Sequence, residues 1–146
     1  MDKESILLRL KNLTEESQRE FGIMTPQHMV EHLILTVKLS YGRIKIPEFE
    51  PNEKQLMQKQ ALIYSDISFP RGIRAPGIGD QLLDLRFSDL GTAKLELLKS
   101  IDDYDSYFKS DPEAKTVHPR FGKLTHQEWE LFHKKHFEHH LGQFGI

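Results

Sequence analysis

The sequence THQEWELFHKKHFEHHLGQF at residues 125–144 is the stretch that decides the fold. Its first four residues have the T-x-x-E pattern of a capping box, in which Thr125 and Glu128 satisfy free amides at the start of a helix. The apolar, aromatic and charged residues that follow recur at a helical period. We therefore expect a helix from His126 to about Phe144 with one buried face.

The histidines of this predicted helix divide between its faces. At about 100° per residue, four side chains fall within about 40° of Trp129 and share its core-facing stripe: His133, His136, His140 and Gln143. Lys134, Lys135 and Glu138 point to the opposite, solvent-facing side. Two histidines four residues apart can direct ring nitrogens at a common point, so His136 and His140 are candidate metal ligands. Taken alone, the pair fits equally well with buried histidines that are satisfied by neighbouring hydrogen bonds.

A second buried helix supplies a third candidate ligand. Thr25-Pro26 combines a capping hydroxyl with a residue suited to the first helical position, and the helix continues through MVEHLILTVKLSY. Gln27, Glu31 and Lys38 cluster on one side, which we expect to face solvent. His32 lies well away from them, among apolar residues. A neutral imidazole there would be costly unless its nitrogens had partners.

Together, His32, His136 and His140 predict a site for one divalent metal ion. Because the chain has no cysteine, only nitrogen and oxygen ligands are available. Three imidazoles would leave positions open for water or substrate, as in a catalytic site. Zinc and nickel rank first as the ion, ahead of iron and manganese. We expect His28, His133 and Gln143 to support this site or to line its pocket.

The rest of the chain predicts three more helices, one of them short or broken, and long connectors. The helices are expected over residues 2–21, over 53–66 after a cap at Asn52, and over 89–110 after a cap at Ser88. No segment is a convincing strand, because proline interrupts IKIPEF. The fold expected is all-α, with four helices in a bundle.

One connector carries two further candidate residues. In the Gly/Pro-rich segment at residues 67–81, Arg71 and Arg74 could hold an anionic substrate or a thiol cofactor. The commoner role of such a pair is to be solvated at the surface.

Size and composition narrow the functional classes. A chain of 146 residues fits a single domain over 1–146. The net charge is -2 and the basic residues are scattered, which argues against nucleic acid as a partner. No apolar span reaches membrane length and no targeting segment is apparent, so we expect a cytoplasmic protein with no membrane partner.

Two stretches resemble a known family: HPRFGKLTHQEWELFHKKHFEHHLGQFG at 118–145 and TPQHMVEHLILTV at 25–37. They are similar to the DinB-like (DinB/YfiT) superfamily of metal-dependent enzymes, within a branch of small bacterial proteins. The resemblance implies a four-helix bundle, a homodimer and a three-histidine metal site at His32, His136 and His140.

The resemblance also implies an activity on a small-molecule substrate. The reaction expected is that of a metal-dependent hydrolase or of a transferase that uses a low-molecular-weight thiol. Two alternatives stay open at this point. The chain could be a non-catalytic bundle that binds a metal or small ligand for sensing or storage, or a degenerate relative without activity.

Overall fold

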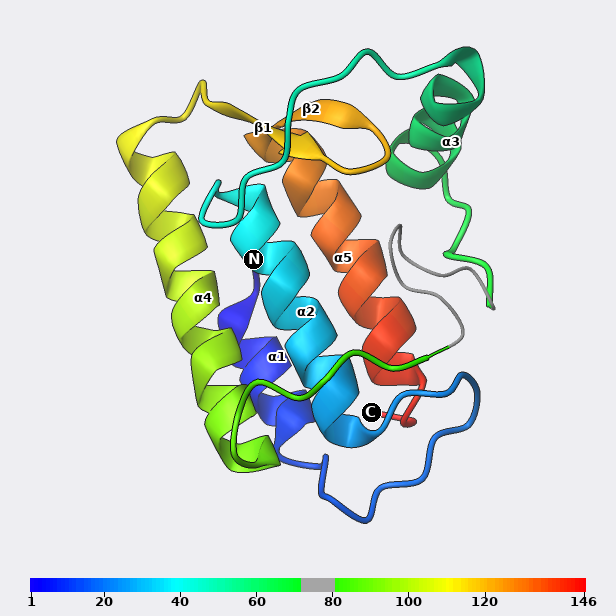
Figure 1. Ribbon diagram of the computed structural model, residues 1–146, viewed down its shortest axis with the longest axis vertical. Coiled ribbons are helices and arrows are strands. Elements are labelled where there is room, and N and C mark those ends of the chain that lie inside the picture. The colour runs from blue at the N-terminus through cyan, green and yellow to red at the C-terminus, as the bar shows by residue number, and fades with distance from the viewer. Residues whose placement is uncertain (72–80) are drawn as a thin grey trace.

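The computed structural model describes residues 1–71 and 81–146, which form a mostly helical molecule with a small β-hairpin (Figure 1). The elements of this described part are, in chain order, α1 (Lys3–Leu10), α2 (Pro26–Ser40), α3 (Glu53–Tyr64), α4 (Leu90–Ser110), β1 (Lys115–His118), β2 (Gly122–Thr125) and α5 (His126–Gly142). Helices α2 and α4 run in the same direction, and α5 runs antiparallel to them (Figure 1). Helix α3 lies to one side, against α5.

Each helix begins at a side chain that accepts a hydrogen bond from an amide of its first turn. The capping residues are Asp2, Thr25, Asn52, Asp89 and Thr125. The caps expected at Thr25, Asn52 and Thr125 are confirmed, the last as a full capping box with Glu128. The expected cap at Ser88 is wrong by one residue. Asp89 is the cap, and its carboxylate accepts the Thr92 amide at 2.7 Å.

The core lies where α2, α4 and α5 meet, with α1 packed on α4. Apolar side chains that are fully shielded from solvent fill it: Met29, Val30, Leu33, Val37, Leu97, Ile101 and Leu141. Helix α2 is buried over most of its circumference, as its composition predicted. Within the described ranges, no helix combines the length and apolarity that a membrane span requires.

The first helix is much shorter than predicted. We expected it to reach residue 21, but α1 ends at Leu10. Beyond Leu13 no apolar residue continues the helical period until Phe21. Instead, the Ser17 hydroxyl accepts the Thr14 amide at 2.9 Å, and the Ser17 amide donates to the Thr14 carbonyl at 3.1 Å. Serine and threonine side chains compete with helical hydrogen bonds in this way, and here they form a turn.

The expectation that the chain has no strand is also wrong. Strands β1 and β2 pair antiparallel, with Lys115 opposite Thr125 and His118 opposite Gly122. Gly122 has a φ of 72°, and a Cβ at this position would lie 2.8 Å from the Pro51 ring. The turn therefore requires glycine. Strands of four residues are too short to show an alternating pattern in the sequence.

The hairpin is fastened to both helices that carry the candidate ligands. The Thr116 hydroxyl donates to the Ser40 carbonyl, in the last turn of α2, at 2.7 Å. The same oxygen accepts the indole N–H of Trp129, near the start of α5, also at 2.7 Å. This contact fixes the position of the hairpin beside the α2–α5 contact.

Candidate metal centre

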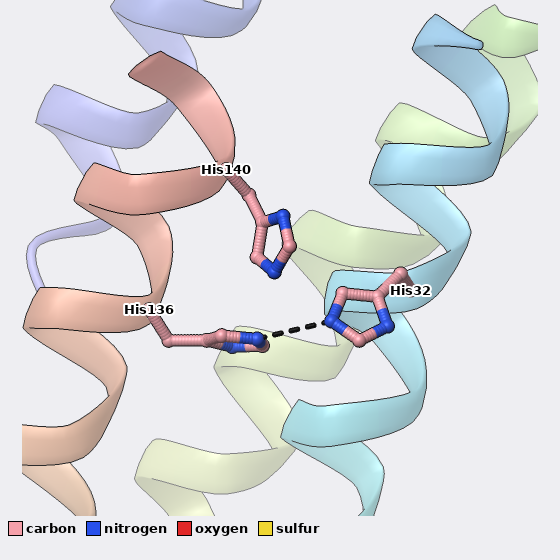
Figure 2. A group of neighbouring side chains, drawn as sticks. All are labelled: His32, His136 and His140. Carbon is pink, nitrogen blue, oxygen red and sulfur yellow. Dashed lines mark hydrogen bonds between the residues drawn. The ribbon is translucent and has the colours of Figure 1, made fainter. Parts of the chain in front are cut away.

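Helix α5 places His133, His136 and His140 on its buried face, as the helical wheel predicted. Trp129 and His133 are fully buried, and His136, His140 and Gln143 are between 6% and 8% exposed. His136 and His140 are one turn apart, and both rings extend from α5 toward α2 (Figure 2). Phe132 packs against His136, and Phe137 packs against His133.

Helix α2 supplies the facing histidine. His32 is half-buried on the side of α2 that turns to α5, and its ring lies opposite those of His136 and His140 (Figure 2). The ring of His32 lies 5.0 Å from that of His136 and 4.5 Å from that of His140, centroid to centroid. The structure thus brings together three side chains that come from two separate stretches of sequence.

The spacing of the ring nitrogens suits a shared ion. One nitrogen from each ring lies within 4.8 Å of the other two, and the Nε2 atoms of His32 and His136 are 3.0 Å apart. Two imidazoles that bind one ion, each at about 2.0–2.1 Å, have their nitrogens about 3.0–3.4 Å apart. Among the described residues, this is the one group of histidine or acidic side chains with such a geometry. The cluster can therefore hold a metal ion.

Hydrogen bonds orient one of the three rings for this role. The side-chain oxygen of Gln143 accepts the Nδ1–H of His140 at 2.8 Å, which leaves the Nε2 lone pair of His140 free. His136 Nδ1 is buried and has no hydrogen-bond partner in the described part of the chain. The rings cannot satisfy all of their nitrogens with one another. The nitrogens that face one another, among them Nε2 of His32 and of His136, offer lone pairs to a cation between the rings, so the donor set fits a metal.

Burial keeps all three imidazoles neutral. It lowers the pKa of His32 to about 4 and that of His140 to about 3, and neighbouring histidines add to both effects. Burial and the charges of His140 and His32 likewise hold the pKa of His136 well below its usual value. Neutral imidazoles have the lone pairs that a metal ion requires.

The cluster forms part of the wall of a cavity of about 440 Å³. The other walls come from the segments at 21–24 and 82–87, the hairpin turn, and the face of α2 around Leu35. Most of these side chains are apolar, among them Ile23, Leu35, Leu39, Leu85, Phe87 and Phe132. A small apolar molecule could therefore reach the three histidines.

The residues predicted to support the site have different positions. Gln143 contacts His140, as described above, and His28 lines the cavity while its ring bonds to the Thr25 hydroxyl. His133 is not brought to the cluster. Its ring stacks on Trp129 and meets Tyr104 edge-on, and it does not line the cavity.

The structure describes one of the two arginines of the Gly/Pro-rich connector. Arg71 is exposed, and its guanidinium carbon lies 4.1 Å from the centre of the Phe21 ring, which lines the cavity. The guanidinium therefore makes a cation–π contact at the edge of the site. Arg74 lies outside the described residues.

Glu31 was expected to face solvent, and this expectation is wrong. The residue is 7% exposed, and its carboxylate accepts the Arg86 amide at 2.6 Å and the side-chain amide of Gln27 at 2.9 Å. Gln27 also donates to the Phe87 carbonyl at 2.8 Å. The two side chains hold the irregular segment at 86–87 across α2, where it forms a wall of the cavity. Glu31 is thus a structural residue of the site.

Sequence reasoning also passed over His118. This histidine ends β1, is 6% exposed and lines the same cavity as the cluster. No wheel could place it, because it lies in a segment that was interpreted as an irregular connector. The only available signal was a histidine followed directly by Pro119 and, three residues on, by Phe121.

Comparison with known families matches residues 2–145 to the family described as "Protein of unknown function (DUF1569)". Because the match covers nearly the whole chain, the protein belongs to this family. No curated protein and no solved structure matches the chain.

Proposed function

We propose that this member of the DUF1569 family is a metal-dependent enzyme that acts on a small molecule at His32, His136 and His140. The observation that carries the proposal is the convergence of three neutral imidazoles on the wall of a cavity of about 440 Å³. Three protein ligands leave coordination positions open, and here those positions would face the cavity. A structural metal site would be closed by a fourth protein ligand.

The reaction proposed is hydrolysis or the transfer of a low-molecular-weight thiol. A bound zinc or nickel ion would lower the pKa of a water or thiol, and it would polarise the substrate group that this water or thiol attacks. The chain's own residues bind and orient: the three imidazoles hold the ion, Gln143 fixes the ring of His140, and the apolar walls exclude water from the substrate. Glu31 is not a candidate base, since its carboxylate is committed to backbone amides.

We further propose that the fold is the four-helix bundle of the DinB-like superfamily. In this arrangement α1, α2, α4 and α5 are the bundle helices, and α3 is the extra one. The positions of the histidines, one on α2 and two on α5, support the relationship, and so does the side-by-side packing of these helices (Figure 1).

Elemental analysis of protein prepared without a histidine tag tests the metal site. Wild-type protein should carry about one divalent ion per chain, and His136→Ala should carry at least roughly tenfold less because three ligands become two. His126→Ala is the matched control, since His126 lies at the start of α5 and does not line the cavity. A metal-free wild type, or a His136→Ala variant with unchanged metal content, would contradict the proposal.

A second measurement separates an enzyme from a storage or sensing protein. After substitution with cobalt, the visible spectrum of the wild type should shift when azide is added, because azide enters an open coordination position. A spectrum that azide leaves unchanged would indicate a closed site and favour the non-catalytic alternative.

A further inference from the structure

The turn of the hairpin fixes the proton of His118 on one particular nitrogen. Nδ1 of this ring accepts the backbone amides of Arg120 at 3.0 Å and Phe121 at 3.3 Å. A ring nitrogen that accepts N–H groups carries no proton itself. In the neutral imidazole the proton therefore lies on Nε2, at the other end of the ring.

Aromatic side chains hold this ring in place. It stacks on Phe121, with centroids 4.5 Å apart and planes 13° from parallel, and meets Phe132 edge-on at 4.6 Å. Trp129 lies 5.4 Å away. Rotation of the ring would break these contacts and both backbone hydrogen bonds, so the direction of the Nε2–H group is set by the fold.

The Nε2–H group is available to a ligand. It has no hydrogen-bond partner in the described part of the chain. The nitrogen is also not sealed from solvent. Because His118 is otherwise buried and lines the cavity, the remaining access is from the cavity. The ring of Phe132 contacts both His118, at 4.6 Å, and His136, at 5.0 Å, so this one side chain links the donor to the cluster along the cavity wall.

We propose that His118 is a substrate-contacting residue whose Nε2–H donates a hydrogen bond to an oxygen of the molecule bound at the three-histidine cluster. This proposal rests on the proposed function above. The ligand class is a small molecule with an apolar body and a carboxylate or hydroxamate head. One oxygen of the head would bind the metal, and another would accept from His118.

His118 acts here as a neutral donor and not as a proton shuttle. Burial, with a smaller effect of Arg120, lowers the pKa of His118 to about 3. The ring therefore stays neutral near pH 7 and polarises an oxygen without giving up its proton. A neutral imidazole held in this way is an established means of stabilising charge on a substrate oxygen.

Two substitutions separate this role from the structural role of the ring. In His118→Asn, the amide oxygen can take the place of Nδ1 and accept the turn amides, but nothing replaces the Nε2–H donor. In His118→Gln, the amide nitrogen can take the place of Nε2, and the acceptor for the turn is lost. A purely structural role predicts that Gln is the more harmful change, whereas the proposal predicts that Asn weakens ligand binding more.

Calorimetry on the metal-loaded protein provides the test, with benzohydroxamate as the large probe and azide as the small one. His118→Asn should bind benzohydroxamate about tenfold more weakly than the wild type, the effect of one lost hydrogen bond. His118→Gln should keep most of the affinity, and azide should bind all three proteins equally because it contacts only the metal. Equal benzohydroxamate affinities in the wild type and His118→Asn would overturn the proposal.

The nitrogen-15 spectrum of wild-type histidines gives a readout that needs no variant. His118 should show a protonated Nε2 and a bare Nδ1, and benzohydroxamate should shift its Nε2–H signal. A bare Nε2, or a signal that the probe leaves unchanged, would overturn the proposal. Failure of the proposed function is a different result, namely a wild type without metal in elemental analysis, and it would remove the role of His118 as well.

Discussion

The two halves of α5 carry histidines on the same buried face and use them differently. In the first half, His133 is fully buried between Trp129 and Tyr104, and neither of its ring nitrogens has a partner among the described residues. In the second half, His136 and His140 meet His32 across the α2–α5 contact. Residue type, helix face and burial are shared, so none of these decides which histidine becomes a ligand.

What differs is the side chain on the opposing helix. Helix α4 places an aromatic ring, that of Tyr104, against His133, and the contact is one of packing. Helix α2 places a third imidazole against His136, and the contact is between ring nitrogens. In both cases the burial of the histidine has a free-energy cost, because its ring nitrogens lose their contact with water. Only in the second half of α5 do the buried rings together present lone pairs that one cation can bind.

The largest expected difference between the halves is in stability without metal. His133→Ala should lower the free energy of unfolding by about 3 kcal/mol, because it leaves a void where the fully buried ring packs between Trp129 and Tyr104. His140→Ala should cost much less, because His140 already borders the cavity. Denaturant unfolding in the presence of a chelator measures both.

Adding metal should offset most of this difference. An ion at a hundredfold excess over its dissociation constant should stabilise the wild type and His133→Ala by about 2.7 kcal/mol, and should not stabilise His140→Ala. If His140→Ala gained the same stabilisation, the second half of α5 would not be the metal-binding half.

The histidine positions could be predicted from sequence because periodicity determines them. Once the capping box fixed the start of α5, the rotation per residue put His136, His140 and Gln143 on the face of Trp129. The same reasoning placed His32 on the apolar side of α2. Each of these predictions requires the geometry of a single helix. The burial of His136, His140 and Gln143 confirms them for α5, and His32 is half-buried.

What could not be predicted depends on irregular segments that fold over the helices. Glu31 appeared to face solvent because nothing in the sequence shows that the amides at 86–87 cross α2 and bond to it. His118 had no period to place it, because β1 has four residues. His133 was expected to support the site or line its pocket, because a wheel gives the face of one helix but not the identity of the residue opposite.

Acid should destabilise the chain through these buried rings, and His133 gives the cleanest case. Burial, then the positive charge of the N-terminus and the proximity of His118, lower the pKa of His133 to about 3 in the folded chain. Below pH 6.5 the unfolded chain gains a proton at this residue and the folded chain does not, so stability falls as the pH falls.

Replacing His133 by phenylalanine should remove this one contribution. Between pH 6.5 and 5.0, the metal-free wild type should lose about 1.5 kcal/mol more than His133→Phe, from the single proton involved. Denaturant unfolding at the two pH values measures the difference. Equal losses in the two proteins would mean that His133 takes up a proton in the folded state, contrary to its environment.

The smallest expected effect concerns how the second half of α5 holds its ligands, and it depends on Gln143. Its oxygen accepts from His140 Nδ1 at 2.8 Å, and nothing comparable supports His133. Gln143→Leu keeps the buried volume but removes the acceptor, so the metal affinity should fall about tenfold. Gln143→Glu supplies a carboxylate acceptor in the same place and should bind metal at least as tightly as the wild type. Competition with a chromophoric chelator ranks the three proteins. If the leucine variant bound as tightly as the wild type, packing against His32 would suffice to orient His140, and the two halves of α5 would differ only in the residue that faces them.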